Sequence, residues 1–148
     1  MRLFLDTNIV LDYLLHRTPF YHDSRTVTLL GCVGETENFI SASTVTDINY
    51  FLAKEYGSLK AQEIIERDLD FLKLAPVTQS EIASALKRRW SDFEDAVVAA
   101  CAENAKADFI VTRNQSDFAL SKIKALSPTE LLQWFESSNI IFDILDLI

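Results

Sequence analysis

The chain of 148 residues fits one domain with a sizeable hydrophobic core, residues 1–148, because nothing in its sequence resembles an interdomain linker. Its formal net charge of −8 argues against a protein that coats nucleic acid with a basic surface, although it leaves open an enzyme that binds phosphates through metal ions. No apolar stretch has the length of a signal peptide or a membrane span, so we expect a cytoplasmic protein with no membrane partner.

Short apolar segments alternate with longer amphipathic ones along the chain. Residues 2–5 and 109–112 have the composition of β-strands, and residues 38–41 and 73–77 have it more weakly. Apolar residues with the 3.6-residue period of helices occur around residues 9–14, 27–30, 45–52, 64–72, 82–86, 97–101 and 131–135. This alternation predicts an α/β fold with a mostly parallel sheet that helices cover on both faces.

Acidic residues follow the first two predicted strands. Asp6 comes directly after residues 2–5 and, with Asn8, offers a carboxylate and an amide at the sheet edge, although Asp is also a common helix cap. Asp47 lies one turn into a helix that Ser43 is expected to cap, and taken singly it is explained equally well as a surface acid. Because ligands of parallel sheets bind beyond the carboxyl ends of the strands, both acids are candidates for one site.

Basic and acidic residues then flank the start of an alanine-rich helix. Ser91 and Glu94 fit a capping box, which places Asp92 and Asp95 one turn apart on the same face and leaves Glu94 as the capping partner. Such acids are also stabilised by the helix dipole alone. The preceding run 87–90, Lys-Arg-Arg-Trp, is either a solvated helix end or a basic lip that grips RNA phosphates beside a stacking face.

Polar side chains follow the strand at residues 109–112. Thr112, Arg113 and Asn114, together with Asn8, offer groups that suit phosphate oxygens, so we expect them to bind substrate. Asp117 follows within a few residues as a further acid; a solvated loop for Arg113 and a short helix start for Asp117 are the alternatives. Carboxylates gathered at one edge repel one another unless a cation lies among them, which predicts a divalent metal site.

The cysteines, the histidines and the C-terminus favour structural roles. Cys32 and Cys101 are expected to be buried free thiols, and His16 and His22 have no partner at the spacing of a zinc site. The apolar residues 139–148 are expected to cover a core edge or to form a subunit interface, which predicts a homodimer.

Nearly the whole chain resembles the PIN-domain nucleases through four motifs in order: Leu-Asp-Thr-Asn, Ser-x-x-x-Asp, Asp-Phe-Glu-Asp-Ala-x-x-x-Ala-Ala and Thr-Arg-Asn-x-x-Asp-Phe. The resemblance implies a three-layer α/β/α sandwich and Mg²⁺- or Mn²⁺-dependent cleavage of RNA, as in VapC-like toxins that pair with a protein antitoxin. It implies a catalytic quartet of Asp6, Asp47, Asp95 and Asp117. Metal ligands would be Asp6, Asp92, Asp95 and Asp117. Many members carry Glu where this chain has Asp47, and the shorter side chain favours a water-mediated role there.

Two other functions compete with an endoribonuclease. A phosphatase of the haloacid dehalogenase type needs a second Asp two residues after its nucleophile, and this chain has Asn8 at that distance from Asp6. A non-catalytic PIN-like binding module would tolerate apolar or basic residues at the acidic positions, and none of these positions has one. The sequence therefore predicts a hydrolase that acts on RNA.

Overall fold

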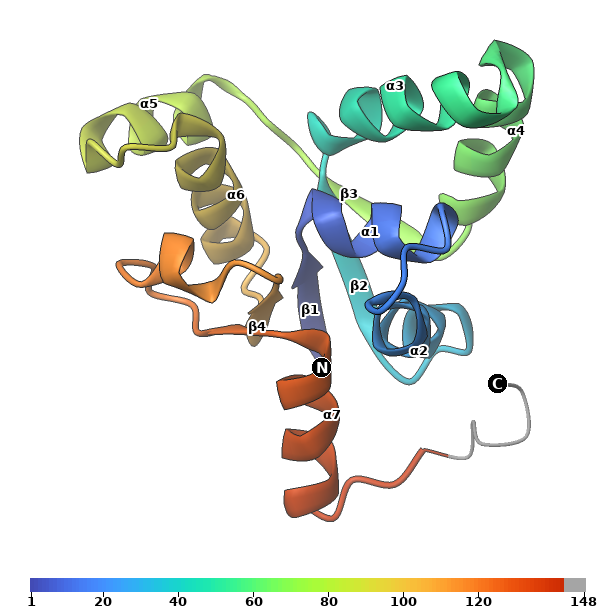
Figure 1. Ribbon diagram of the computed structural model, residues 1–148. Helices are drawn as coiled ribbons and strands as arrows, with labels where there is room; N and C mark the ends of the chain where they lie inside the picture. The colour runs from blue at the N-terminus through green and yellow to red at the C-terminus, as the bar shows by residue number, and fades with distance from the viewer. Residues whose placement is uncertain (143–148) are drawn as a thin grey trace.

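Parallel strands form the centre of the molecule in the computed structural model, which describes residues 1–142 (Figure 1). The elements are β1 (Arg2–Leu5), α1 (Thr7–Leu14), α2 (Tyr21–Cys32), β2 (Glu37–Ser41), α3 (Thr44–Tyr56), α4 (Ser58–Asp68), β3 (Leu72–Ala75), α5 (Gln79–Arg88), α6 (Phe93–Asn104), β4 (Phe109–Val111), the 3-10 helix η1 (Gln115–Phe118), β5 (Ala125–Leu126) and α7 (Pro128–Ser137). The sheet order is β3-β2-β1-β4-β5, and every neighbouring pair is parallel.

Alternate residues of the central strand β1 enter two separate cores, one on each face of the sheet. Leu3 and Leu5 pack with apolar residues of α1, α2, α3, α4 and α7. Phe4 packs instead with residues of α5, α6 and η1. Because side chains of a strand point to opposite faces in turn, this division confirms the predicted three-layer α/β/α architecture, with α5 and α6 to the left of the sheet in Figure 1.

Helix α6 is buried almost all round, and its composition explains why. Residues 95–102 are all buried, and the small side chains among them let the helix lie close against the sheet, as predicted. This close packing fixes the first turn of α6 near the carboxyl end of β1. Cys101 is buried within it, as expected, whereas Cys32 is exposed because it is the last residue of α2.

Several element boundaries differ from the predicted ones. The helical period assigned to residues 64–72 extends too far, since α4 ends at Asp68 and Leu72 begins β3. Strand β5 was not predicted because two residues carry no periodicity. Ser127 and Glu130 form a capping box with Pro128 at the first helical position, which confirms the predicted start of α7.

The membrane and C-terminal predictions have different outcomes. Within residues 1–142, no helix is long and apolar enough to cross a membrane. Residues 143–148 of the predicted interface segment 139–148 lie outside the described residues, and the role of the segment stays a prediction. In its described part, the ring of Phe142 packs on that of Phe135 with centroids 4.7 Å apart.

Candidate active site

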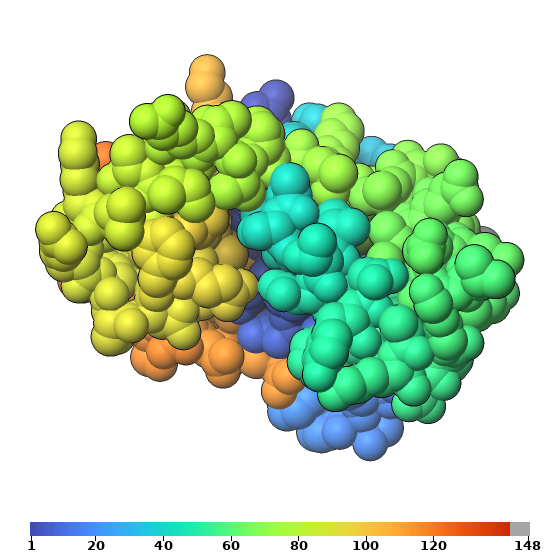
Figure 2. All heavy atoms as spheres, turned by 90° about the horizontal axis from the view of Figure 1, so that it is seen from above, coloured from blue at the N-terminus to red at the C-terminus, as the bar shows by residue number. Residues whose placement is uncertain are grey.

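The predicted acids lie around a hollow at the carboxyl edge of the sheet. Figure 2 views this edge from above: yellow residues of α6, cyan residues at the start of α3 and orange residues around η1 surround blue residues of the N-terminal segment. Asp6 follows β1 directly, Thr112 follows β4, and α3 begins three residues after β2. Segments more than a hundred residues apart in sequence therefore meet at one place.

Asp6 is held in a fixed position at the end of β1. Its side chain is 6% exposed, and its Oδ1 accepts a hydrogen bond of 2.8 Å from the backbone N–H of Thr7. Its Oδ2 accepts from Thr112 Oγ1 at 2.8 Å and from Asn8 Nδ2 at 3.0 Å. Burial raises the pKa of Asp6, these three donors lower it, and the charge of Asp117 raises it. Asp6 thus caps α1 and also presents a carboxylate to the site.

Two residues predicted to bind substrate are used inside the protein. Thr112 is fully buried, and besides donating to Asp6 its hydroxyl accepts a bond of 3.0 Å from the Asn114 N–H. The Asn8 side-chain oxygen accepts from the Arg113 N–H at 3.4 Å while its amide donates to Asp6. Both side chains therefore join the ends of β1 and β4 and orient the Asp6 carboxylate.

Arg113 also has a partner within the fold. Its Nε lies 2.8 Å from Oδ2 of Asp12, a fully buried acid on α1. Its guanidinium carbon lies 4.1 Å from the ring centroid of Phe20. Burial raises the pKa of Asp12, and the charges of Arg113 and Arg17 oppose that rise. The Arg113 side chain thus anchors the loop after β4 to α1.

The first turn of α6 differs from its predicted form and brings in an additional acid. The cap is Asp92, not Ser91: Asp92 Oδ1 accepts from the N–H groups of Glu94 at 2.9 Å and Asp95 at 3.2 Å. Because the helix begins at Phe93, Glu94 is not a capping partner. Carboxylate oxygens of Asp92, Glu94 and Asp95 lie within 4.8 Å of one another.

Electrostatic repulsion connects this group with the remaining acids. Asp95 is 8% exposed, and burial together with the charges of Asp92, Asp6, Glu94 and Asp117 raises its pKa to about 7. The pKa of Glu94 is raised by burial and by the charges of Asp6, Asp47 and Asp92. These couplings mean that the acids of α3, α6, η1 and the end of β1 act on one another across the hollow.

The outer acids lie at the rim. Asp47 on α3 and Asp117 in η1 are exposed. Among residues 1–142, Asp6 and Asp117 stand outside the tight group of α6 acids, although their charges reach Asp95. Asn114, also exposed, keeps its side chain at the surface, and its carbonyl accepts from the Asp117 N–H at 3.0 Å.

A chain of hydroxyl groups was not predicted from the sequence. Thr7 Oγ1 lies 3.1 Å from Thr44 Oγ1, which lies 2.9 Å from Ser41 Oγ, and Ser41 Oγ lies 2.9 Å from Ser43 Oγ. These bonds tie the start of α3 to the start of α1. Ser43 consequently makes no side-chain cap of α3. The signal in the sequence was the density of Ser and Thr directly after a strand.

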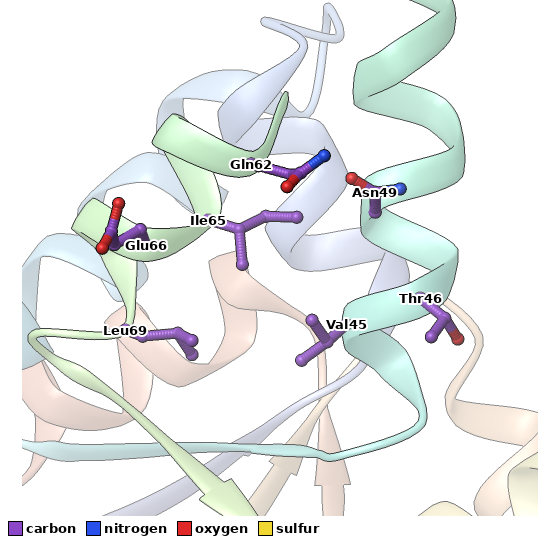
Figure 3. Close-up of a pocket in the computed structure, with 7 residues that line it drawn as sticks. All are labelled: Val45, Thr46, Asn49, Gln62, Ile65, Glu66 and Leu69. Atoms are coloured by element: carbon purple, nitrogen blue, oxygen red, sulfur yellow. The ribbon is translucent and has the colours of Figure 1, made fainter. Parts of the chain in front are cut away.

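A larger hollow, of about 670 Å³, lies between α3 and α4 (Figure 3). In Figure 3 the side chains of Val45, Ile65 and Leu69 point into it, with Asn49 and Gln62 at its upper side. None of the acids around Asp95 lines it. Its size therefore does not make it the catalytic cavity, because Glu66 lines it without the acids that surround Asp95.

The donor set of the acidic hollow fits a hard divalent cation. Within residues 1–142, the group of side chains that could hold an ion there consists of the carboxylates of Asp92, Glu94 and Asp95, and such ions prefer carboxylate oxygens. The pKa of Asp95 is raised by its burial and by the like charges of the neighbouring carboxylates. A cation bound there would relieve this repulsion.

Comparisons with known proteins agree with the fold. Residues 2–116 match the family model described as PIN domain. No curated protein sequence matches the chain. Among solved structures, the chain is similar to a toxin-antitoxin complex from Klebsiella pneumoniae, with 19% identity, a TM-score of 0.64, and coverage of 85% of this chain and 97% of that one.

Two further structures have the same fold. VapBC-1 from nontypeable Haemophilus influenzae has 17% identity and a TM-score of 0.66, covering 87% of this chain and 99% of that one. VapC20 from Mycobacterium tuberculosis, a sarcin-ricin loop cleaving toxin, has 14% identity and a TM-score of 0.56, covering 73% and 86%. At these identities the likeness concerns the fold alone.

Proposed function

Because the chain belongs to the PIN-domain family, we propose that it is a metal-dependent endoribonuclease that hydrolyses RNA phosphodiester bonds in the cytoplasm. One observation carries this proposal: carboxylate oxygens of Asp92, Glu94 and Asp95 lie within 4.8 Å of one another at the carboxyl edge of the sheet. Burial and the charges of Asp92, Asp6, Glu94 and Asp117 accordingly raise the pKa of Asp95 to about 7. Repulsion of this kind is relieved when a cation binds, and a divalent cation held at a sheet edge can in turn bind phosphate.

Each acid has a role in this proposal. Asp6, Asp92, Asp95 and Asp117 hold the metal, and Glu94 joins them because its carboxylate lies within 4.8 Å of Asp92 and Asp95. Asp47, on the opposite side at α3, acts through water because it is exposed and shorter than Glu. Asp6, Asp47, Asp95 and Asp117 form the catalytic quartet.

Neighbouring groups position these acids and the substrate. Thr112 and Asn8 fix the Asp6 carboxylate through their hydrogen bonds. Asn114 stays exposed at the rim, where it is available to a phosphate oxygen. When bound, Mg²⁺ or Mn²⁺ supplies a water of lowered pKa and offsets charge on the scissile phosphate. Asp95 loses its proton as the cation binds, since metal ligands must be deprotonated.

Cleavage of mixed RNA tests the enzymatic proposal. We expect wild-type protein to cut RNA with Mg²⁺ or Mn²⁺ and to stop in chelator. Asp6→Asn and Asp95→Asn are expected to lower the rate by about 100-fold or more, since even lesions around a metal site cost roughly 10- to 100-fold. Asp70→Asn, at an exposed acid in the turn after α4, is the control. Full activity in chelator contradicts the proposal, and RNA bound without cleavage identifies a non-catalytic PIN-like binding module.

We also propose that the protein is the toxin of a toxin–antitoxin pair and has a protein antitoxin as partner. Similar folds from Klebsiella pneumoniae and Haemophilus influenzae are described as a toxin-antitoxin complex and as VapBC-1, which supports this role. The adjacent open reading frame is expected to encode a small DNA-binding protein whose co-expression suppresses growth arrest. Unimpaired growth when the chain is expressed alone contradicts the toxin role and leaves the nuclease proposal intact.

A homodimer through residues 139–148 is the remaining part of the proposal. Ile141 is 86% exposed, which leaves apolar surface at the end of the described chain. Sedimentation of the full chain is expected to give a dimer, and deletion of residues 140–148 is expected to give a monomer. A monomer in both samples contradicts the proposal.

A further inference from the structure

A cavity of about 280 Å³ adjoins the acidic hollow, between the end of α5 and η1. Asp92, Asp95 and Asp117 line its acidic part, and Arg89 and Trp90 line it as well. Its volume lies close to the lower limit of the roughly 300–1,000 Å³ range of small-ligand sites. The cavity therefore has a volume suited to a ligand of about the size of one nucleotide.

Neighbouring arginines at the end of α5 have different partners. Arg88 donates to both oxygens of Glu103 at 2.9 and 2.7 Å, so its charge is neutralised within the fold. Arg89 is exposed and, among residues 1–142, forms no ion pair or side-chain hydrogen bond. Its backbone turns into the left-handed region with φ of 55°, which directs the chain from α5 toward the cavity. Arg89 thus supplies an uncompensated positive charge beside the acids.

Trp90 supplies a fixed aromatic surface next to that charge. Its ring is half-buried, stands edge-on to Phe118 with centroids 6.4 Å apart, and has the Arg88 guanidinium carbon 5.7 Å from its centroid. Because Arg88 is itself held by Glu103, the ring is supported from two elements. An aromatic ring held in this way loses little conformational freedom when a base stacks on it.

We propose that this cavity is a nucleotide subsite, in which the base of one unpaired nucleotide stacks on Trp90 while Arg89 binds the phosphate next to the scissile bond. The inference rests on the proposed function, because the same acids line the cavity and the hollow. A base inside a duplex cannot reach Trp90 without unstacking, so the subsite accepts an unpaired nucleotide and not a paired one. Because every base can stack on an aromatic ring, the subsite distinguishes single-stranded from double-stranded RNA but does not distinguish one sequence from another.

Steady-state cleavage of one oligoribonucleotide, single-stranded or annealed to its complement, tests the subsite. Trp90→Ala is expected to raise KM for the single strand about 10-fold with little change in kcat, and Trp90→Phe is expected to restore it. Arg89→Asn removes the charge with a residue that tolerates positive φ, and it is expected to raise KM similarly. Trp134→Phe on α7 and Lys60→Ala on α4 are matched controls away from the cavity.

Binding separates this inference from the nuclease proposal. Anisotropy of a labelled single strand is measured on the Asp6→Asn protein, which keeps Arg89 and Trp90. Arg89→Asn is expected to reduce the slope of log affinity against log salt by about 0.7, the value for one phosphate contact with a single strand, while Trp90→Ala leaves the slope unchanged. If the binding results are as expected but the wild-type protein does not cleave the RNA, they support the subsite and contradict the nuclease proposal. Cleavage with unchanged KM in both variants, or equal losses on the duplex, overturns the subsite.

Discussion

The orientation and the pKa of the Asp6 carboxylate depend on Thr112, which lies 106 residues later in the chain. Thr112 Oγ1 donates to its Oδ2 at 2.8 Å from a fully buried position, while the Asn114 N–H donates to the same hydroxyl. The hydroxyl thereby lowers the pKa of Asp6 against the effect of burial and fixes the direction of the carboxylate. Thr112 is a positioning residue, because its burial keeps it from touching substrate.

Replacing Thr112 by Val tests this role with almost no change of shape. Asp6 loses a donor, so its pKa rises further and its affinity for Mn²⁺ is expected to fall by about 10- to 100-fold. Thr112→Ser is expected to restore binding because it restores the hydroxyl. Thr26→Val is the control, since that hydroxyl donates to the His22 carbonyl on α2, away from the site. Calorimetric titration with Mn²⁺ measures the affinity, and wild-type binding by Thr112→Val would contradict the assignment.

Asp92 has two roles at the start of α6, and a matched pair of substitutions separates them. It caps α6 through Oδ1, and its carboxylate belongs to the group within 4.8 Å. Asp92→Ser and Asp92→Ala remove the same charge, but only Ser still caps. In chelator, urea unfolding is expected to show Asp92→Ala less stable than Asp92→Ser by about 1 kcal/mol. Both variants are expected to bind Mn²⁺ more weakly than wild type; equal stability of the two contradicts the capping role.

The sequence predicts those features of the site that a few neighbouring residues determine, and it does not predict those that depend on long-range contacts. Asp6 was located correctly because an apolar strand that ends in an acid is visible in five residues. Ser91 and Asp92 are both good caps, and composition alone did not decide between them. That shift of one residue changed the role of Glu94 from capping partner to member of the acidic group. The hydrogen bond from Thr112 to Asp6 joins residues 106 positions apart, so no short stretch of sequence indicates it.

The remaining differences have the same origin in tertiary contacts. Asp12 lies on the buried side of α1, where the charges of Arg113 and Arg17 offset the cost of burying its carboxylate. Arg113 is expected to bind phosphate because hydroxyl, guanidinium and amide groups follow the strand at residues 109–112 directly, and its ion-pair partner Asp12 comes from an element a hundred residues earlier. The parallel sheet, in contrast, followed from the alternation of strands and helices along the chain.

The acidic hollow couples the free energy of unfolding of the protein to pH. The folded-state pKa of Asp95 is about 7, above its ordinary value of 3.8, so between these values the folded state binds a proton that the unfolded state has lost. The stabilisation from this proton is complete below about pH 4 and is lost as the pH rises through about 7. In chelator, the wild-type melting temperature is therefore expected to fall from pH 5 to pH 8 more steeply than that of Asp95→Asn.

Metal binding should reverse this loss, since a ligand that binds only the folded state stabilises it by about 2.7 kcal/mol at a hundredfold excess over its Kd. For a chain of this size that corresponds to a rise of roughly 10 °C in melting temperature.

Asp95→Asn is expected to melt higher than wild type in chelator at pH 8, because one of the repelling charges is gone, and to gain less from Mn²⁺, because one ligand is gone. Asp70→Asn controls for the loss of a carboxylate elsewhere. Thermal scans at pH 5 and pH 8, with chelator and with Mn²⁺, measure both effects. If wild type and Asp95→Asn show the same pH slope and neither is stabilised by Mn²⁺, the carboxylates around Asp95 do not act as one metal-binding cluster.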